Sequence, residues 1–256
     1  MRDDDQKPPN GTGFFDSFDA VAHLVRNPGA ANHAGTAVPG DRPAIDAPPA
    51  VPTAARASIF RPSLRLPMAR LHVVDDGCED GEVVRVRGDR LVVGRIEGDV
   101  VVPHDVLMSP RHAALERLPD GGWRLTDLGS ASGTFVRVDK ARLRHERVIQ
   151  IGATRMRFHE MDLTEAWLVE LVPGGSGRRH ECHAPVTTIG RSGCTITLDD
   201  LFVDELHAEI RRTRKGWRIR NGGANGLWVR LDEPVDLRAP AQFLCGEQRF
   251  VFEPLG

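Results

Sequence analysis

An internal repeat limits the fold of this chain more than any other feature of its sequence. Five landmarks recur in the same order at offsets of 93 to 96 residues. They are Gly94-Arg95 with Gly190-Arg191, His112-Ala113 with His207-Ala208, Gly122-Trp123 with Gly216-Trp217, Gly133 with Gly226, and Gly152 with Gly246. Ordered landmarks at near-constant spacing indicate two copies of one structural unit.

Both copies are built from short runs in which apolar and polar residues alternate. Examples are VVRVR at 83–87 and GTFVRV at 133–138, with Gly, Pro and Asp between the runs. This pattern is typical of half-buried antiparallel strands, and no long helical pattern occurs in 68–256. We therefore predict an all-β protein with two tandem antiparallel β-sandwich domains, at 68–160 and 166–254.

The segment 1–67 has a different composition, since it holds ten of the 18 prolines. A stretch rich in Pro, Ala and Gly buries too little apolar surface to offset its ordering entropy, so we predict a disordered tail. Phe14, Phe18, Val21 and Val25 have helical spacing and predict a short amphipathic helix at 14–26. Such a helix would dock on a partner's groove or on the protein's own body, and both alternatives stay open.

Charge and composition argue against several classes of partner. Lys+Arg and Asp+Glu number 7 and 7 in 1–67, 15 and 15 in 68–160, and 12 and 14 in 161–256. No segment has the basic excess that favours nucleic acid or an anionic membrane. An apolar signal region is absent from the N-terminal sequence, and the four cysteines are widely spaced. We predict a cytoplasmic protein with neither a nucleic acid nor a membrane as partner.

Four separated blocks in the first copy form a compound motif. They are the Gly-Arg of GRIEGD, the SPRH of VLMSPRHA, the turn in LTDLGSASGTFV, and RVIQIGATRMRF. Together they resemble the forkhead-associated (FHA) family, and the resemblance covers about 68–160 and 166–254. It implies an FHA/SMAD-like β-sandwich that binds phosphothreonine peptides with loops at one end.

The resemblance assigns roles to residues of the first copy. The implied phosphopeptide-binding residues are Arg95, Ser109, Arg111, Ser132 and Gly133, and the implied structural residues of the site are Gly94, His112 and Thr134. A guanidinium fork suits two phosphate oxygens at once, and a hydroxyl adds a further donor. Two positions depart from the family pattern, because Ala131 lacks a hydroxyl and Ser132 replaces an asparagine. The peptide-holding half of the site is therefore weakened.

The second copy departs from the family at the phosphate position. Its equivalent residues are Gly190, Arg191, Asp204, His207, Asn225 and Gly226. Asp204 replaces the serine, and its carboxylate would repel a phosphate. We predict a degenerate site, with a rearranged loop compensated by Arg211 and Arg212 as the alternative.

The sequence gives little support for a catalytic site, a metal site or a cofactor site. Ser109, His112 and Asp127 lack the pattern of a catalytic triad, and no nucleophile elbow occurs. The sequence HECH at 180–183 lacks an evident fourth ligand. We predict a non-enzymatic, cofactor-free adaptor that reads phosphothreonine in serine/threonine kinase signalling, with a kinase or its substrate as partner. The alternative is a phosphate-independent protein scaffold made of the same two sandwiches.

Overall fold

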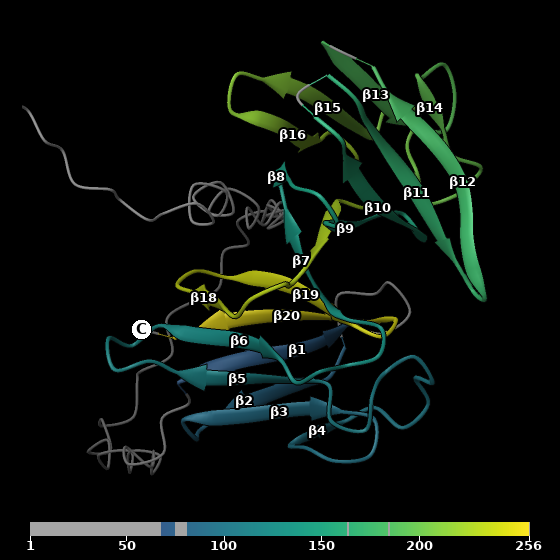
Figure 1. Ribbon diagram of the computed structural model, residues 1–256. Coiled ribbons are helices and arrows are strands. Elements are labelled where there is room, and N and C mark those ends of the chain that lie inside the picture. The colour runs from purple at the N-terminus through teal and green to yellow at the C-terminus, as the bar shows by residue number, and fades with distance from the viewer. Residues whose placement is uncertain (1–67, 75–80, 163, 184, 256) are drawn as a thin grey trace, which may run out of the picture.

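The computed structural model describes residues 68–74, 81–162, 164–183 and 185–255 (Figure 1). Every regular element in these ranges is a β-strand, which confirms the predicted all-β fold. No helix that could span a membrane occurs among the described residues. The predicted tail and its helix at 14–26 lie outside these ranges.

The strands of the first repeat are β1 (Ala69–Val74), β2 (Val83–Val86), β3 (Arg90–Gly94), β4 (Val100–Val101), β5 (Ala113–Arg117), β6 (Trp123–Asp127), β7 (Thr134–Val138), β8 (Lys140–Leu143), β9 (Val148–Ile151) and β10 (Thr154–Glu160). Those of the second repeat are β11 (Ala166–Val172), β12 (Gly175–Cys182), β13 (Val186–Gly190), β14 (Ile196–Thr197), β15 (Ala208–Thr213), β16 (Gly216–Asn221), β17 (Leu227–Arg230), β18 (Val235–Leu237), β19 (Ala241–Cys245) and β20 (Gln248–Pro254).

The described strands form one long sheet and two short ones. The ten-stranded sheet has the order β12-β11-β10-β9-β17-β7-β19-β20-β1-β2. The two five-stranded sheets have the orders β18-β6-β5-β3-β4 and β14-β13-β15-β16-β8. Pairing is antiparallel except for β4 and β14, which pair in parallel with β3 and β13. Each short sheet faces one half of the long sheet, which gives two sandwiches.

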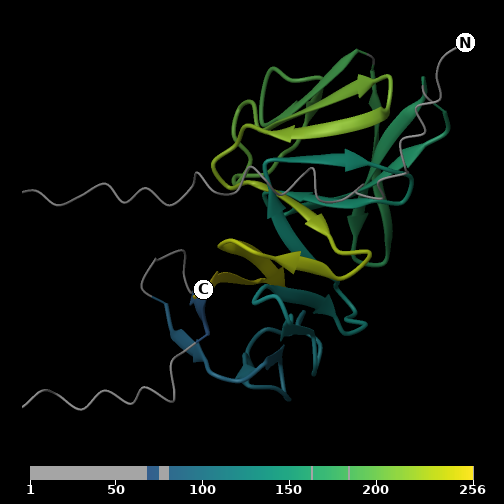
Figure 2. The same cartoon turned by 90° about the vertical axis from the view of Figure 1, so that its left-hand side faces the viewer.

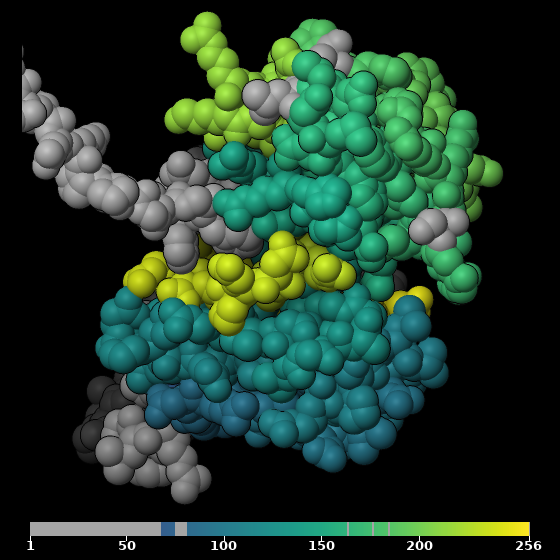
Figure 3. All heavy atoms as spheres, in the orientation of Figure 1, coloured from purple at the N-terminus to yellow at the C-terminus, as the bar shows by residue number. Residues whose placement is uncertain are grey.

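The two repeats exchange their last three strands. β18, β19 and β20 of the second repeat complete the sandwich that contains β1–β6, and β8, β9 and β10 of the first repeat complete the other. Figure 1 shows the yellow C-terminal strands among the blue ones, and Figure 2 shows the same exchange from the side. In Figure 3 the yellow residues form a band that separates the blue and green bodies. The sandwiches therefore do not coincide with the sequence ranges 68–160 and 166–254.

Strands β7 and β17 join the two halves at a pseudo-two-fold axis. They pair antiparallel, with Val136 opposite Val229 and Leu227 opposite Val138. After β7 a single residue, Asp139, leads the chain into β8 of the second sandwich. A direct reversal of a strand usually takes a loop of about two residues or more, so this short connection carries the chain onward.

The hydrophobic cores of both sandwiches also depend on the strand exchange. In the first sandwich Trp123 of β6 packs edge-on against Phe252 of β20, with ring centroids 5.5 Å apart. In the second, Trp217 of β16 packs against Phe158 of β10 at 6.2 Å. All four side chains are fully buried. Burying each aromatic ring contributes on the order of 2 kcal/mol, so either repeat alone would lose a large part of its core.

Candidate functional site

Three loops of the first sandwich bring the predicted site residues together. Arg95 follows β3, Ser109 precedes β5, and Ser132 precedes β7. The Arg95 amide donates to the Ser109 carbonyl at 3.0 Å, and the Ser132 hydroxyl donates to the Leu107 carbonyl at 3.0 Å. Arg111 is exposed on the middle loop. The loops therefore converge on one end of the sandwich.

Close packing explains the glycine that precedes Arg95. A Cβ on Gly94 would lie 2.2 Å from the Pro110 carbonyl oxygen and 2.5 Å from that of Glu97. Neither contact is tolerable for a real side chain, so only glycine lets the first and middle loops approach this closely.

His112 ties the middle loop to the loop before β7. Its Nδ1 accepts a hydrogen bond from the Ser109 amide at 3.1 Å, and its Nε2 donates to the Gly133 carbonyl at 3.2 Å. The ring is fully buried, and this burial lowers the pKa of His112 below its usual value of 6.5. The imidazole is therefore neutral, carries its proton on Nε2 and holds the two loops together by hydrogen bonds.

The loop before β7 is shaped by Asp127, which lies in the LTDLGSASGTFV block but was not assigned a role in the binding site. Its carboxylate accepts from the Ser130 hydroxyl and from the buried Thr134 hydroxyl, both at 2.6 Å. Although burial opposes ionisation, the hydrogen bonds from Ser130 and Thr134 lower the pKa of Asp127. Gly133 at the end of this loop has a φ of 80°, a conformation that L side chains rarely adopt.

Ser109 contacts the loop before β7 directly. Its Oγ accepts a hydrogen bond from the Ala131 amide at 2.9 Å. Because the hydroxyl acts as the acceptor in this bond, its own hydrogen stays available for a ligand oxygen.

The guanidinium of Arg95 has no partner among the described residues. Its Nε is enclosed by the protein and makes no hydrogen bond to them. A buried donor without an acceptor costs about 1–3 kcal/mol. The residue as a whole is half-buried, so its exposed part is open to an anion.

The exchanged strands support this site through Asp105, a second residue that the motif comparison missed. Asp105 is 8% exposed, and its Oδ1 accepts from the Leu107 amide at 2.9 Å. Its Oδ2 accepts from the Glu247 and Gln248 amides, at 2.8 and 3.1 Å, in the turn between β19 and β20. Asp200 occupies the same place in the second repeat and accepts from the Ala153 amide at 2.8 Å. The recurrence of Asp105 as Asp200 within the repeat was the signal that could have found it.

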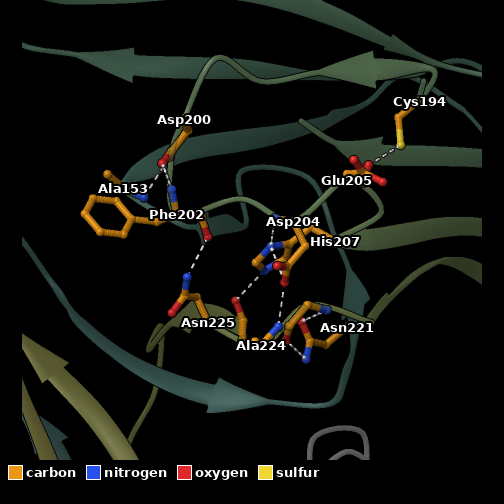
Figure 4. Close-up of polar contacts among 12 residues, drawn as sticks. Ala153, Cys194, Asp200, Phe202, Asp204, Glu205, His207, Asn221, Ala224 and Asn225 are labelled. Atoms are coloured by element: carbon orange, nitrogen blue, oxygen red, sulfur yellow. Dashed lines mark hydrogen bonds and ion pairs between the residues drawn. The ribbon is translucent and has the colours of Figure 1, made fainter. Parts of the chain in front are cut away.

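The second sandwich has the same frame with different chemistry (Figure 4). His207 accepts from the Asp204 amide at 3.1 Å and lies 3.0 Å from the Gly226 carbonyl. The Asn225 amide nitrogen donates to the Phe202 carbonyl at 2.8 Å, which matches the bond from Ser132 to Leu107. The second copy thus keeps the loop geometry of the first.

Asp204 takes the place of Ser109 in this frame. Its carboxylate accepts the Ala224 amide at 2.7 Å, as the Ser109 hydroxyl accepts the Ala131 amide. The position that is a neutral hydroxyl in the first site therefore carries a charged group in the second. Arg191 is exposed nearby, and its amide donates to the Asp204 carbonyl at 2.9 Å.

Metal-capable side chains gather at one place among the described residues, away from both sites. Glu146 Oε1 lies 3.4 Å from His145 Nε2 and 3.1 Å from His159 Nδ1. His145 Nδ1 accepts from the Glu160 amide, so the neutral ring carries its proton on Nε2, toward Glu146. These three groups satisfy one another, and the expectation of no metal stays a prediction.

Parts of this chain are similar to a known family and to known proteins. The family model described as "FHA domain" matches residues 91–152 and 187–245. The FHA domain-containing protein FhaB of Mycolicibacterium smegmatis is 33% identical over 101 residues, which span 39% of this chain and 63% of that protein. Among solved structures, Mycobacterium tuberculosis EmbR in complex with a low-affinity phosphopeptide matches 73% of this chain and 25% of its own, with a TM-score of 0.33 and 13% identity. The chain therefore carries two regions in tandem, 91–152 and 187–245, that match the FHA domain family.

Proposed function

We propose that the protein is an adaptor that binds a phosphothreonine-containing protein through the first site. The observation that carries this proposal is the unpartnered guanidinium of Arg95 beside the loop of Ser109. A phosphate brings about −1.5 to −2 charge and three acceptor oxygens, which suit this cation and the free hydrogen of Ser109. Arg111 adds a second exposed cation on the same loop. Ser132 and Gly133 border the peptide side of the site.

We do not assign phosphothreonine binding to the second site. The Asp204 carboxylate already takes the Ala224 amide and would face a bound phosphate with like charge. At an effective dielectric of about 20, two like charges about 5 Å apart repel by about 3 kcal/mol, a large share of a micromolar affinity. We infer that this half of the molecule serves as a scaffold.

The test is a titration of the whole chain with a fluorescent phosphothreonine peptide library and its unphosphorylated counterpart. The whole chain is needed because β18–β20 complete the first sandwich. We expect Arg95→Ala to lower the affinity at least tenfold, since it removes a charge-assisted contact. The matched control is Arg191→Ala, which makes the same change in the second site and should leave binding unaltered. Equal binding of both libraries by all three proteins would instead favour the phosphate-independent scaffold.

A further inference from the structure

The strand exchange extends a basic stretch of the second repeat with cations from the first repeat. β8 comes from the first repeat and carries Lys140 and Arg142, and it pairs with β16 of the second repeat. The segment 211–220 of β15 and β16 holds six cations and no carboxylate, but β8 precedes β16 by more than 70 residues in the chain. In the folded protein they are neighbours in one sheet.

Cations lie opposite one another across this sheet. Arg142 of β8 faces Arg218 of β16, which faces Arg211 of β15. In the next row Lys140 faces Arg220, which faces Glu209 of β15. The five cationic side chains are exposed, while the residues between them point into the core. Like charges directly opposite one another in a sheet destabilise the fold, so this arrangement has a cost that calls for a reason.

The surface continues over the turn between β15 and β16. Arg214 and Lys215 at that turn, with Arg144 after β8 and Glu160, line an open hollow of about 420 Å³. We call these eight cations the basic face: Lys140, Arg142, Arg144, Arg211, Arg214, Lys215, Arg218 and Arg220. Arg211 is paired with Glu209 at 2.7 Å, and no other cation of the basic face has an ion pair with a described residue.

The equivalent row of the first sandwich provides an internal comparison. There Asp236 of β18 faces Arg124 of β6, and Glu116 of β5 faces Arg90 of β3. Arg124 binds Asp236 at 2.6 Å, and Arg90 binds Glu116 at 3.0 Å. The same sheet position is thus neutralised in one sandwich and left with positive charge in the other. The fold therefore does not require the positive charge.

We propose that the basic face binds an extended acidic segment of a protein partner. The face is a sheet surface on which side chains of alternate residues lie about 6.6 Å apart along a strand, and carboxylates at alternate positions of an extended chain have the same spacing. A membrane is disfavoured because none of the eight residues is apolar, so nothing would insert. Nucleic acid is disfavoured because the chain as a whole has a net charge of −2 and a pI of about 6.6, and the face lacks exposed aromatic rings for stacking on bases.

The test uses the whole chain and a labelled twelve-residue peptide of alternating Glu and Ser, followed by fluorescence anisotropy. The variant Arg142→Gln/Arg218→Gln should weaken binding about tenfold, in line with removing two complementary charges. The matched control is Arg90→Gln/Arg124→Gln, which makes the same charge change in the first sandwich and should not weaken binding. Denaturant unfolding should show that Arg142→Gln/Arg218→Gln is at least as stable as the wild type, because a like-charge pair is removed.

Two further probes separate this partner from other polyanions. A 20-base-pair DNA duplex and vesicles containing phosphatidylserine are titrated under the same salt conditions. The proposal is supported if the peptide binds more tightly than either probe and only the variant of the basic face loses affinity. It is overturned if the peptide does not bind, if both variants bind equally, or if the duplex or the vesicles bind more tightly. The peptide contains no phosphothreonine, so its binding is independent of the first site.

Discussion

The substitution of Ser109 by Asp204 changes the chemistry of the second site while leaving the hydrogen-bonded loops of the two sites alike. Ser109 and Asp204 accept the same type of backbone hydrogen bond, from Ala131 and Ala224 respectively. A hydroxyl in this place keeps a hydrogen to donate, whereas a carboxylate only accepts. The loop geometry is thus kept by the backbone and the histidine, while the side chain at this position differs in what it can donate to a ligand.

His112 makes the stability of the protein depend on pH. Its pKa is lowered from 6.5 by burial, so the unfolded chain takes up a proton at a higher pH than the folded one. We therefore expect the free energy of unfolding to fall as the pH drops below about 6.5, by at most about 1.4 kcal/mol per pH unit from this group. The measurement is urea unfolding of the wild type and of His112→Asn between pH 5 and pH 8.

The comparison with His112→Asn isolates this histidine from the others in the chain. The variant lacks the titrating group, so its deficit in stability should be largest near pH 8 and should shrink toward pH 5. A deficit that stays constant across this range would show that His112 does not titrate in the way its burial implies.

Among the elements, the turn between β19 and β20 supports a binding loop from the other repeat. Asp105 connects the two segments, because its carboxylate accepts hydrogen bonds from amides on both. Replacing Asp105 by Ala would leave these amides, of which those of Met108 and Gln248 are buried, without the carboxylate acceptor. We expect a loss of about 3 kcal/mol in the free energy of unfolding, together with faster hydrogen exchange at Leu107, Met108, Glu247 and Gln248.

The matched control for Asp105→Ala is Asp200→Ala in the second sandwich. It should lower stability by a similar amount and speed exchange at Ala153, while the amides of Glu247 and Gln248 keep their protection. If Asp105→Ala left the exchange of Glu247 and Gln248 unchanged, the turn would not depend on this carboxylate.

Much of the element structure follows from local sequence. Alternating runs and turn residues predict the strands, and the repeated Gly-Arg, His and Gly landmarks predict which loops meet. The roles of Asp105 and Asp127 were not predicted. Asp105 recurs as Asp200 but has no motif of its own, and Asp127, inside the LTDLGSASGTFV block, aligns with Asn221 in the second repeat. The full extent of the basic face was not predicted either, because the cations of β8 join those of 211–220 only through strand pairing between distant parts of the chain.

At the scale of the whole molecule, the strand exchange is not predicted by the sequence, because the two repeats are alike. β6 and β16 are copies of one strand, and so are β8 and β18, so each has two sequence-compatible partners. Trp123 could form the same aromatic contact with Phe158 or with Phe252. In the structure it packs against Phe252. A sequence pattern predicts which faces are apolar, but it does not distinguish two equivalent apolar faces.

The exchange predicts how the chain responds to a cut between its repeats. A protease site inserted into the loop 161–165, between β10 and β11, would divide the chain into a fragment with β1–β10 and one with β11–β20. Each sandwich would then hold strands from both fragments, with the pairs Trp123–Phe252 and Phe158–Trp217 joining them. We therefore expect the cleaved protein to elute as one species in native size-exclusion chromatography. We also expect each fragment, purified in denaturant and refolded alone, to lack the cooperative unfolding that returns when the two are refolded together. Contiguous sandwiches would give the opposite result, with two fragments that separate on the column and unfold cooperatively on their own.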